Sequence, residues 1–127
     1  MKTSSAKAKG RRLQQWVAKQ ISKITGLPCG KDEVIESREM GQAGTDVKLY
    51  GLAKEKFPFS VECRNRETWS IPAFVEDAKK YKEKGTDWLL FVTKNRYGNL
   101  VVMDAEVFFD IYEQYLNMLF GKDHKLN

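Results

Sequence analysis

The stretch Trp88-Leu-Leu-Phe-Val-Thr93 is a continuous run of apolar residues. A short run of this kind is typical of a central β-strand that is covered on both faces. Turn residues follow at 95–99, and a second apolar run at 100–103 predicts another strand. We therefore expect a β-sheet at the centre of the domain, with helices packed on it.

A helix is predicted immediately before this strand, over about 72–84. Pro72 stands at the first-turn position that proline favours, and Gly85 ends the segment. Apolar residues recur at helical spacing and define the face expected to be buried: Phe74, Val75, Ala78 and Tyr81.

The last predicted helix covers about 105–120, with Asp104 as its N-terminal cap and Gly121 at its end. Its apolar face is unusually wide. The main stripe consists of Val107, Phe108, Ile111, Tyr115 and Leu119, and it is widened by Tyr112, Leu116 and Phe120. Two interpretations are open: the helix carries a second buried interface, such as a dimer contact, or its own domain covers it fully.

The N-terminal half predicts one helix, over about 10–25, and three short strands, over about 33–39, 45–50 and 59–64. The apolar stripe of this helix is Leu13, Trp16, Val17, Ile21 and Ile24. The element order is then α-β-β-β-α-β-β-α. This order predicts a single α/β domain with helices packed on a central sheet.

The length of the chain limits the number of domains, and its charge distribution indicates the kind of partner. The 127 residues suit one domain, over about 10–121, between a loose basic arm at 1–9 and a polar tail at 122–127. The first 31 residues hold eight basic side chains and no acid, whereas the remaining 96 hold 14 basic and 17 acidic ones. A +8 segment before a −3 body indicates a polyanionic partner, usually nucleic acid.

Several chemistries are excluded by residue counts. His124 is the only histidine and lies in the polar tail, so catalysis by a Ser-His-Asp or Cys-His group and a His-built zinc site are disfavoured. Cys29 and Cys63 form neither a metal-binding pair motif nor a disulfide framework, and a reducing cytosol is expected. No apolar run is long enough to predict a membrane span or a signal peptide. Any enzymatic chemistry should rest on carboxylates, basic side chains and a hard metal ion.

Three charged residues fit that chemistry. Asp46 begins one predicted strand, while Glu62 and Arg64 point to one face of the next strand because side chains alternate. If the two strands pair as a hairpin, Asp46 meets Glu62, and a divalent cation such as Mg²⁺ relieves the repulsion between the carboxylates. The alternative is a turn acid beside a solvated charged stripe. The apolar surroundings of Glu62 argue against it, because unpaired charges are disfavoured there.

At this point the sequence resembles the PD-(D/E)XK nuclease superfamily. The segment Ser37-Arg-Glu-Met-Gly-Gln-Ala-Gly-Thr-Asp46 and the segment Phe59-Ser-Val-Glu-Cys-Arg-Asn65 carry the likeness, with Trp-x-Ile-Pro following. Within the superfamily, the chain is most similar to small phage-encoded Holliday-junction-resolvase-like endonucleases, which also share a basic helix with Lys-Gly-Arg-Arg. The likeness covers roughly residues 9–103 and implies a restriction-endonuclease-like mixed sheet flanked by helices.

The resemblance also implies a metal site. Asp46 and Glu62 would bind Mg²⁺, for which Mn²⁺ can substitute, and the backbone carbonyl of Cys63 would complete the protein ligands. Gln14 matches a position where archaeal resolvases carry glutamate. Its amide can hold a water of the metal, or it can be a plain amide on the helix surface. Glu39 is either an outer acid of the site or an edge-strand surface charge.

Arg64 departs from the family, which has lysine at this position. Arginine can neutralise a phosphate, but it stays protonated and is a poor proton carrier. Two functions therefore follow: a Mg²⁺-dependent endonuclease, or a catalytically weakened or inactive DNA-binding module with the nuclease fold.

The substrate implied by the resemblance is branched DNA, most of all the four-way junction of phage recombination or replication, in the host cytoplasm. Ends, flaps or duplex sites are the alternatives. Resolution of a junction needs paired cuts, which implies a homodimer. Five basic residues are candidate phosphate contacts, although each one alone can be a solvated surface charge. These residues are Lys7, Lys9, Arg11, Arg12 and Arg66.

Overall fold

A five-stranded sheet with the order β1-β2-β3-β4-β5 organises the computed structural model, which describes residues 2–39 and 41–125, with side chains from residue 5 onward. Met40, in the Ser37–Asp46 segment that carries the resemblance, and the last two residues of the predicted tail lie outside the described residues. The strands are β1 (Ile35–Ser37), β2 (Val47–Leu49), β3 (Phe59–Asn65), β4 (Asp87–Thr93) and β5 (Leu100–Met103).

Strand pairing follows from the lengths of the connections. Loops over 38–46 and 94–99 join β1 to β2 and β4 to β5, and these pairs are antiparallel, as are β2 and β3. β3 and β4 are parallel because the helix α3 (Ile71–Lys80) returns the chain between them. The prediction that 88–93 forms an interior strand is confirmed, since β4 lies between β3 and the edge strand β5.

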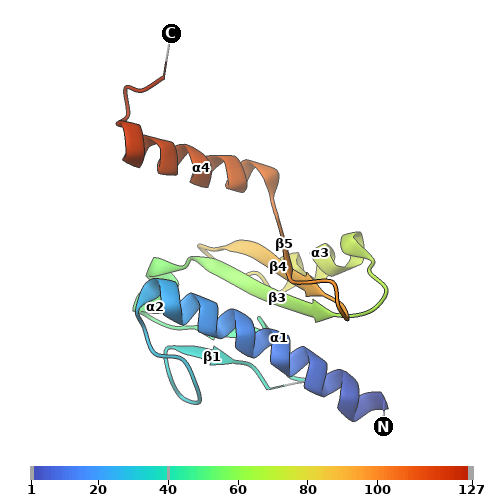
Figure 1. Ribbon diagram of the computed structural model, residues 1–127. Coiled ribbons are helices and arrows are strands. Elements are labelled where there is room, and N and C mark those ends of the chain that lie inside the picture. The colour runs from blue at the N-terminus through green and yellow to red at the C-terminus, as the bar shows by residue number, and fades with distance from the viewer. Residues whose placement is uncertain (1, 40, 126–127) are drawn as a thin grey trace.

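The helix α1 (Lys2–Thr25) covers one face of the sheet over β1, β2 and β3 (Figure 1). Its predicted end near residue 25 is correct, but it begins at Lys2 rather than near residue 10. Residues 2–9, expected as a loose arm, continue the helix because Ala and Lys are strong helix formers and no proline interrupts them. The basic segment therefore has a regular helical shape.

The predicted stripe of α1 is correct only in its middle. Leu13, Val17 and Ile21 are buried in a core that includes Val61 of β3. Trp16 is 42% exposed because it lies on the flank of the helix, outside the buried arc, whereas Ile24 lies within that arc but in the last turn of α1 and is 70% exposed. Counting apolar residues at helical spacing does not show where the covered surface ends.

The opposite face of the sheet is covered by α3, which packs on β3 and β4. Phe74 and Ala78 of the predicted face are buried, and Phe74 lies in a second core cluster with Leu90 and Val92. A fourth helix, α2 (Leu52–Lys56), was not predicted, because a single turn shows no periodicity. Ala53, completely buried, fixes α2 to the core beneath α1.

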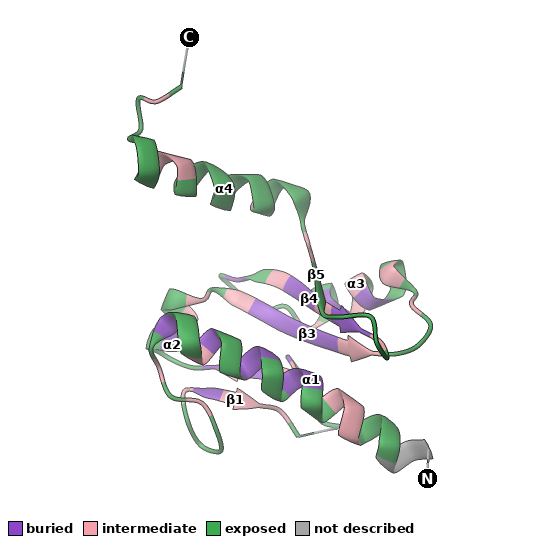
Figure 2. Cartoon of the chain, viewed as in Figure 1, coloured by how far each residue is buried: buried purple, intermediate pink, exposed green. Residues whose placement is uncertain are grey.

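The helix α4 (Ala105–Phe120) projects beyond the edge strand β5, away from the rest of the protein (Figure 1). Its predicted bounds and its Asp104 cap are confirmed: the Asp104 carboxylate accepts from the backbone N–H groups of Glu106 and Val107. No residue of α4 is buried, and Figure 2 shows it as almost entirely exposed. The interpretation that its own domain covers this helix is therefore wrong.

The protein is a single α/β domain with a five-stranded mixed sheet and four helices in the described residues. Within that part of the chain, none of the helices has both the length and the apolar character needed to cross a membrane.

Candidate functional site

The pairing of β2 with β3 fixes the position of Asp46. The two strands are in register at Val47 and Val61, and the Asp46 backbone N–H donates to the Val61 carbonyl at 2.8 Å. Asp46 thus lies one step before β2, beside Glu62 on the neighbouring strand. This is the arrangement predicted from a hairpin of the two segments.

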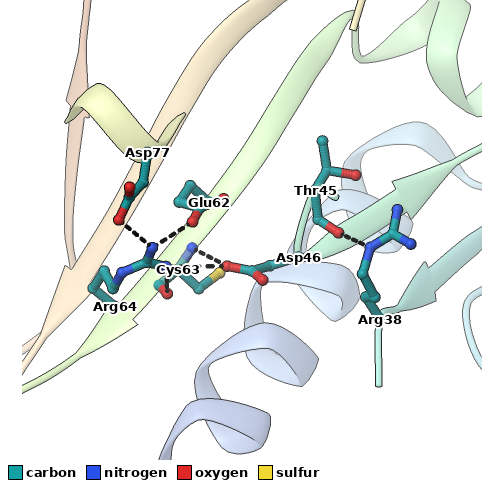
Figure 3. A network of polar contacts seen from close by, with 7 residues as sticks. All are labelled: Arg38, Thr45, Asp46, Glu62, Cys63, Arg64 and Asp77. Carbon is teal, nitrogen blue, oxygen red and sulfur yellow. Dashed lines mark hydrogen bonds and ion pairs between the residues drawn. The ribbon is translucent and has the colours of Figure 1, made fainter. Parts of the chain in front are cut away.

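The guanidinium of Arg64 lies between the two carboxylates (Figure 3). Its Nη2 is 2.6 Å from Glu62 Oε2, and its Nη1 is 3.6 Å from Asp46 Oδ2. Nη1 also donates to the backbone carbonyl of Cys63 at 2.9 Å. All three groups that the resemblance assigns to a metal ion therefore meet one cation of the chain itself.

Asp77 of α3 is a member of this network that the sequence did not single out. Its Oδ2 accepts from Arg64 Nη2 at 2.9 Å, and the Phe74 ring lies 5.7 Å from Arg64 Cζ. The only sequence feature that could have pointed to Asp77 is its place beside the apolar face of a predicted helix. Its significance depends on α3 lying over β3, which the sequence does not specify.

Burial makes the two carboxylates unusually basic. It raises the pKa of Glu62 to about 7, and the nearby Asp46 charge adds to this, while Arg64 opposes it. Burial also raises the pKa of Asp46, against the lowering effects of the Cys63 N–H, Arg64 and Arg38. The site therefore favours ionised carboxylates only when a cation compensates for lost water.

Arg64 remains the positive group. Burial disfavours its charged form, yet Glu62, Asp77 and Asp46 together raise the Arg64 pKa above its usual value. Burial also raises the pKa of the Cys63 thiol well above its usual value, with the two carboxylates adding to the effect. The thiol is thus a neutral core group, and the polar atoms of Cys63 at this site belong to its backbone.

The turn before Asp46 is held by Arg38, another residue without a predicted role. Arg38 Nε donates to the Thr45 carbonyl, and the Arg38 backbone N–H donates to the Asp46 carbonyl at 2.8 Å. Gly44 has φ of 115°, and a Cβ added there would lie 2.7 Å from the Arg38 guanidinium. A glycine is needed at this position for both reasons. Asp46 Oδ2 in turn accepts from the Cys63 N–H at 2.7 Å.

Gln14 is not a surface amide, which corrects one of its two interpretations. Only 4% of the residue is exposed, and its Oε1 is the one buried side-chain N or O atom in the described residues without a hydrogen-bond partner. The Lys9 carbonyl accepts from Asn65 at the end of β3, and Gln14 follows about 7.5 Å farther along α1. It therefore lies near the level of Cys63, on the α1 side of the sheet.

Glu39 is exposed and lines a groove between α1 and β1 with Gln15 and Lys19. This placement fits the surface-charge interpretation better than the outer-acid one.

The predicted phosphate contacts divide into two groups. Lys9 and Arg66 line one hollow, between the start of α1 and the loop after β3, at the same end of the sheet as Arg64. Lys7, Arg11 and Arg12 are exposed farther out on α1. All five predicted phosphate contacts therefore lie either near the end of β3 or on α1, the helix that crosses this strand.

Aromatic residues lie beside Arg66, a feature that the sequence did not reveal. Trp69 Nε1 donates to the Arg66 carbonyl at 2.8 Å and meets the Tyr97 ring edge-on at 5.2 Å. The ammonium of Lys94 lies 5.0 Å from the Trp69 ring and 4.6 Å from the Tyr97 ring. Cations next to aromatic rings suit contacts with nucleic-acid strands.

Comparison with models of known families, with curated proteins and with solved structures finds no match for this chain.

Proposed function

We propose that this protein is a metal-dependent endonuclease that hydrolyses phosphodiester bonds in branched DNA, with the four-way junction of phage recombination or replication as the favoured substrate. One observation carries the proposal: Asp46, Glu62 and the Cys63 carbonyl all contact a single partly buried cation, the guanidinium of Arg64. A set of oxygen groups that stabilises one cation is suited to another.

The donor set fits Mg²⁺, or Mn²⁺ in its place. Two carboxylates and one carbonyl leave room for waters, which Mg²⁺ usually keeps. In the described residues no three His, Cys, Asp or Glu side chains lie close enough to share a metal, so the protein donors would be these three oxygens. When bound, the ion would activate water and polarise the scissile phosphate.

Asp77 is a partner that can hold the Arg64 guanidinium when a metal ion occupies the site. Its contact with Arg64 Nη2 does not involve the proposed metal ligands. If a divalent ion takes the place between Asp46 and Glu62, the guanidinium keeps Asp77 and the Phe74 ring as partners. Its charge would then remain close enough to stabilise an approaching phosphate.

Gln14 supports a hydrated site. A buried carbonyl oxygen without a partner costs about 1–3 kcal/mol, so a water molecule or another donor is expected there. The amide oxygen of Gln14 would accept a hydrogen bond from a water that also reaches the Asp46 side of the site.

The surface around the site suits a DNA backbone. The hollow lined by Lys9 and Arg66 lies at the Arg64 end of the sheet, and the outer side of α1 carries further basic residues. Contacts of this kind neutralise phosphates without reading bases, as a structure-selective nuclease requires.

The test is cleavage of an end-labelled synthetic four-way junction with Mg²⁺, read against a linear duplex of the same sequence. We expect cuts in the junction. Asp46→Asn should abolish cutting but retain junction binding, because it removes negative charge near the phosphates. The matched control is Glu76→Gln, an exposed acid on α3, which should cut at the wild-type rate. If Asp46→Asn cut the junction at the wild-type rate, the proposed site would be wrong. If the wild type cut flaps, ends or the linear duplex faster than the junction, that DNA structure would be the preferred substrate instead.

A second candidate is a DNA-binding module that has lost catalysis. Arg64 favours it, because a guanidinium held by three carboxylates and a carbonyl competes with metal binding. Arg64→Lys distinguishes the two functions. Junction binding without cutting in the wild type, with cutting gained in Arg64→Lys, would support the binding module.

A further inference from the structure

The exposed apolar surface of α4 calls for a partner. Eight large apolar side chains between Phe108 and Phe120 are 44–76% exposed. At about 200 Å² for each side chain, they present roughly 900 Å² to solvent. A stable protein–protein interface buries about 800 Å² on each side, so this helix alone supplies enough surface.

The apolar side chains extend around more than half of the helix. At 100° per residue, positions from Val107 to Phe120 occupy an arc of about 220°. A helix that packs on one surface needs an apolar stripe of only about 100° or a little more. The wider arc is sufficient for two contacts, one on each side of the helix.

This chain carries a complementary surface that α4 leaves uncovered. Val101 of β5 pairs with Phe91 of β4, and Phe91 packs against the core beneath α1, so both lie on the α1 face. In the part of the chain that the structure describes, α1 packs mainly over β1, β2 and β3, and Val101 on the β5 side of this face is 52% exposed.

Trp16 extends the same strip. Gln15, Ala18 and Lys19 of α1 line a groove with residues of β1, so the opposite flank of the helix points towards β4 and β5. Trp16 lies on that opposite flank and is 42% exposed. An apolar strip thus connects α1 to the sheet edge.

The charges of α4 also match the body of the protein. Its polar side carries Glu106, Asp110 and Glu113, and the helix has no basic residue. α1 has no acid, and Lys23 lies on the same side of the helix as Trp16. The α4 helix of one copy beside α1 of another would therefore bring opposite charges together.

Return of α4 to its own strip is hindered by its connection. Asp104 is the single residue between β5 and α4, and its extended backbone and capping hydrogen bonds hold the helix away from the sheet. Folding back would break this cap, at a cost of about 1 kcal/mol.

From these observations we infer that a second copy of this chain covers α4. In the resulting homodimer, the α4 helix of each copy packs between the partner's Trp16–Val101 strip and the partner's α4. Such a reciprocal contact is closed and two-fold symmetric. It does not depend on whether the protein cleaves DNA.

Analytical ultracentrifugation of the full chain tests this inference. We expect a dimer in the wild type. Leu119→Arg, in the middle of the apolar arc, should raise the dimer dissociation constant by about tenfold or more. Gln114→Arg is the matched control, because it places the same charge outside the apolar arc of the same helix and should weaken the dimer much less than Leu119→Arg does. Circular dichroism should show unchanged secondary structure in both variants.

Two results would overturn the inference. A wild-type monomer throughout the concentration range would do so, whether α4 then meets its own domain, a membrane surface or another protein. A dimer that Leu119→Arg leaves intact would show that α4 is not the interface. Val101→Arg tests the strip on the partner: it should also weaken the dimer, and an unchanged dimer would remove the strip from the interface.

Discussion

At the residue scale, Arg64 is the centre of the site. The sequence predicted that Asp46 and Glu62 meet, and they do so through the guanidinium. It did not predict Asp77 or Arg38, because their contacts depend on how α3 lies over the sheet and how the turn at 38–45 closes. Side-chain alternation along a strand is readable from sequence, whereas contacts between distant elements are not.

The raised Glu62 pKa predicts an unusual dependence of stability on pH. The folded state holds this proton up to about pH 7, while an unfolded glutamate releases it near 4.5. The free energy of unfolding should therefore fall as pH rises from about 5 to about 7, by on the order of 2–3 kcal/mol, and then level off. Urea unfolding in EDTA measures this.

Glu62→Gln is the control for this pH dependence and should flatten the decline between pH 5 and 8. Added Mg²⁺ should restore stability to the wild type at pH 8, since a cation favours the ionised carboxylates. A wild-type protein that gained stability over this range relative to Glu62→Gln would contradict the assignment.

Gly44 and Gly41 form a matched pair for testing the turn before Asp46. Both have positive φ, at 115° and 90°, but only at Gly44 would a Cβ meet the Arg38 guanidinium. Gly44→Ala should therefore cost about 1–2 kcal/mol more than Gly41→Ala, because Arg38 must leave the Thr45 carbonyl. Thermal unfolding measures the difference, and equal losses would show that Arg38 does not hold the turn.

At the element scale, long periodic segments were predicted well and short or terminal ones were not. The predicted spans near 88–93, 100–103 and 105–120 agree with β4, β5 and α4. α2 and the first turns of α1 were missed, because five residues carry no periodic signal and lysines on an exposed helix resemble those in a loose arm. The helical arm holds its basic residues in fixed positions along α1.

Because these basic residues are fixed along α1, we expect that neutralising four of them weakens DNA binding more than neutralising four cations elsewhere. Replacing Lys7, Lys9, Arg11 and Arg12 by Gln should weaken junction binding and lower the slope of log affinity against log salt by about 0.9 for each lost phosphate contact. The control set lies at and after the C-terminal end of α3, the helix on the face of the sheet opposite α1, and loses the same charge: Lys79, Lys80, Lys82 and Lys84. Fluorescence anisotropy at several salt concentrations measures both, and equal effects would show that only net charge matters.

At the scale of the whole molecule, the sequence indicated a helix with surplus apolar surface but not its direction. Folding the helix onto its own sheet and projecting it towards a partner require the same residues, and the choice depends on the single connecting residue, Asp104. The division of charge has a spatial meaning as well. The basic α1 crosses the sheet, while the acids of the site lie beside the sheet's central strand β3, compensated by Arg64.

We propose that the carboxylates of Asp46 and Glu62 support metal-dependent hydrolysis of branched DNA. The rate of junction cleavage as a function of Mg²⁺ concentration tests it most directly. We expect no cutting in EDTA, a rate that rises and saturates with Mg²⁺, and no cutting by Asp46→Asn at any Mg²⁺ concentration. Cutting that persists in EDTA, or no cutting of any DNA structure at any Mg²⁺ concentration, would contradict it.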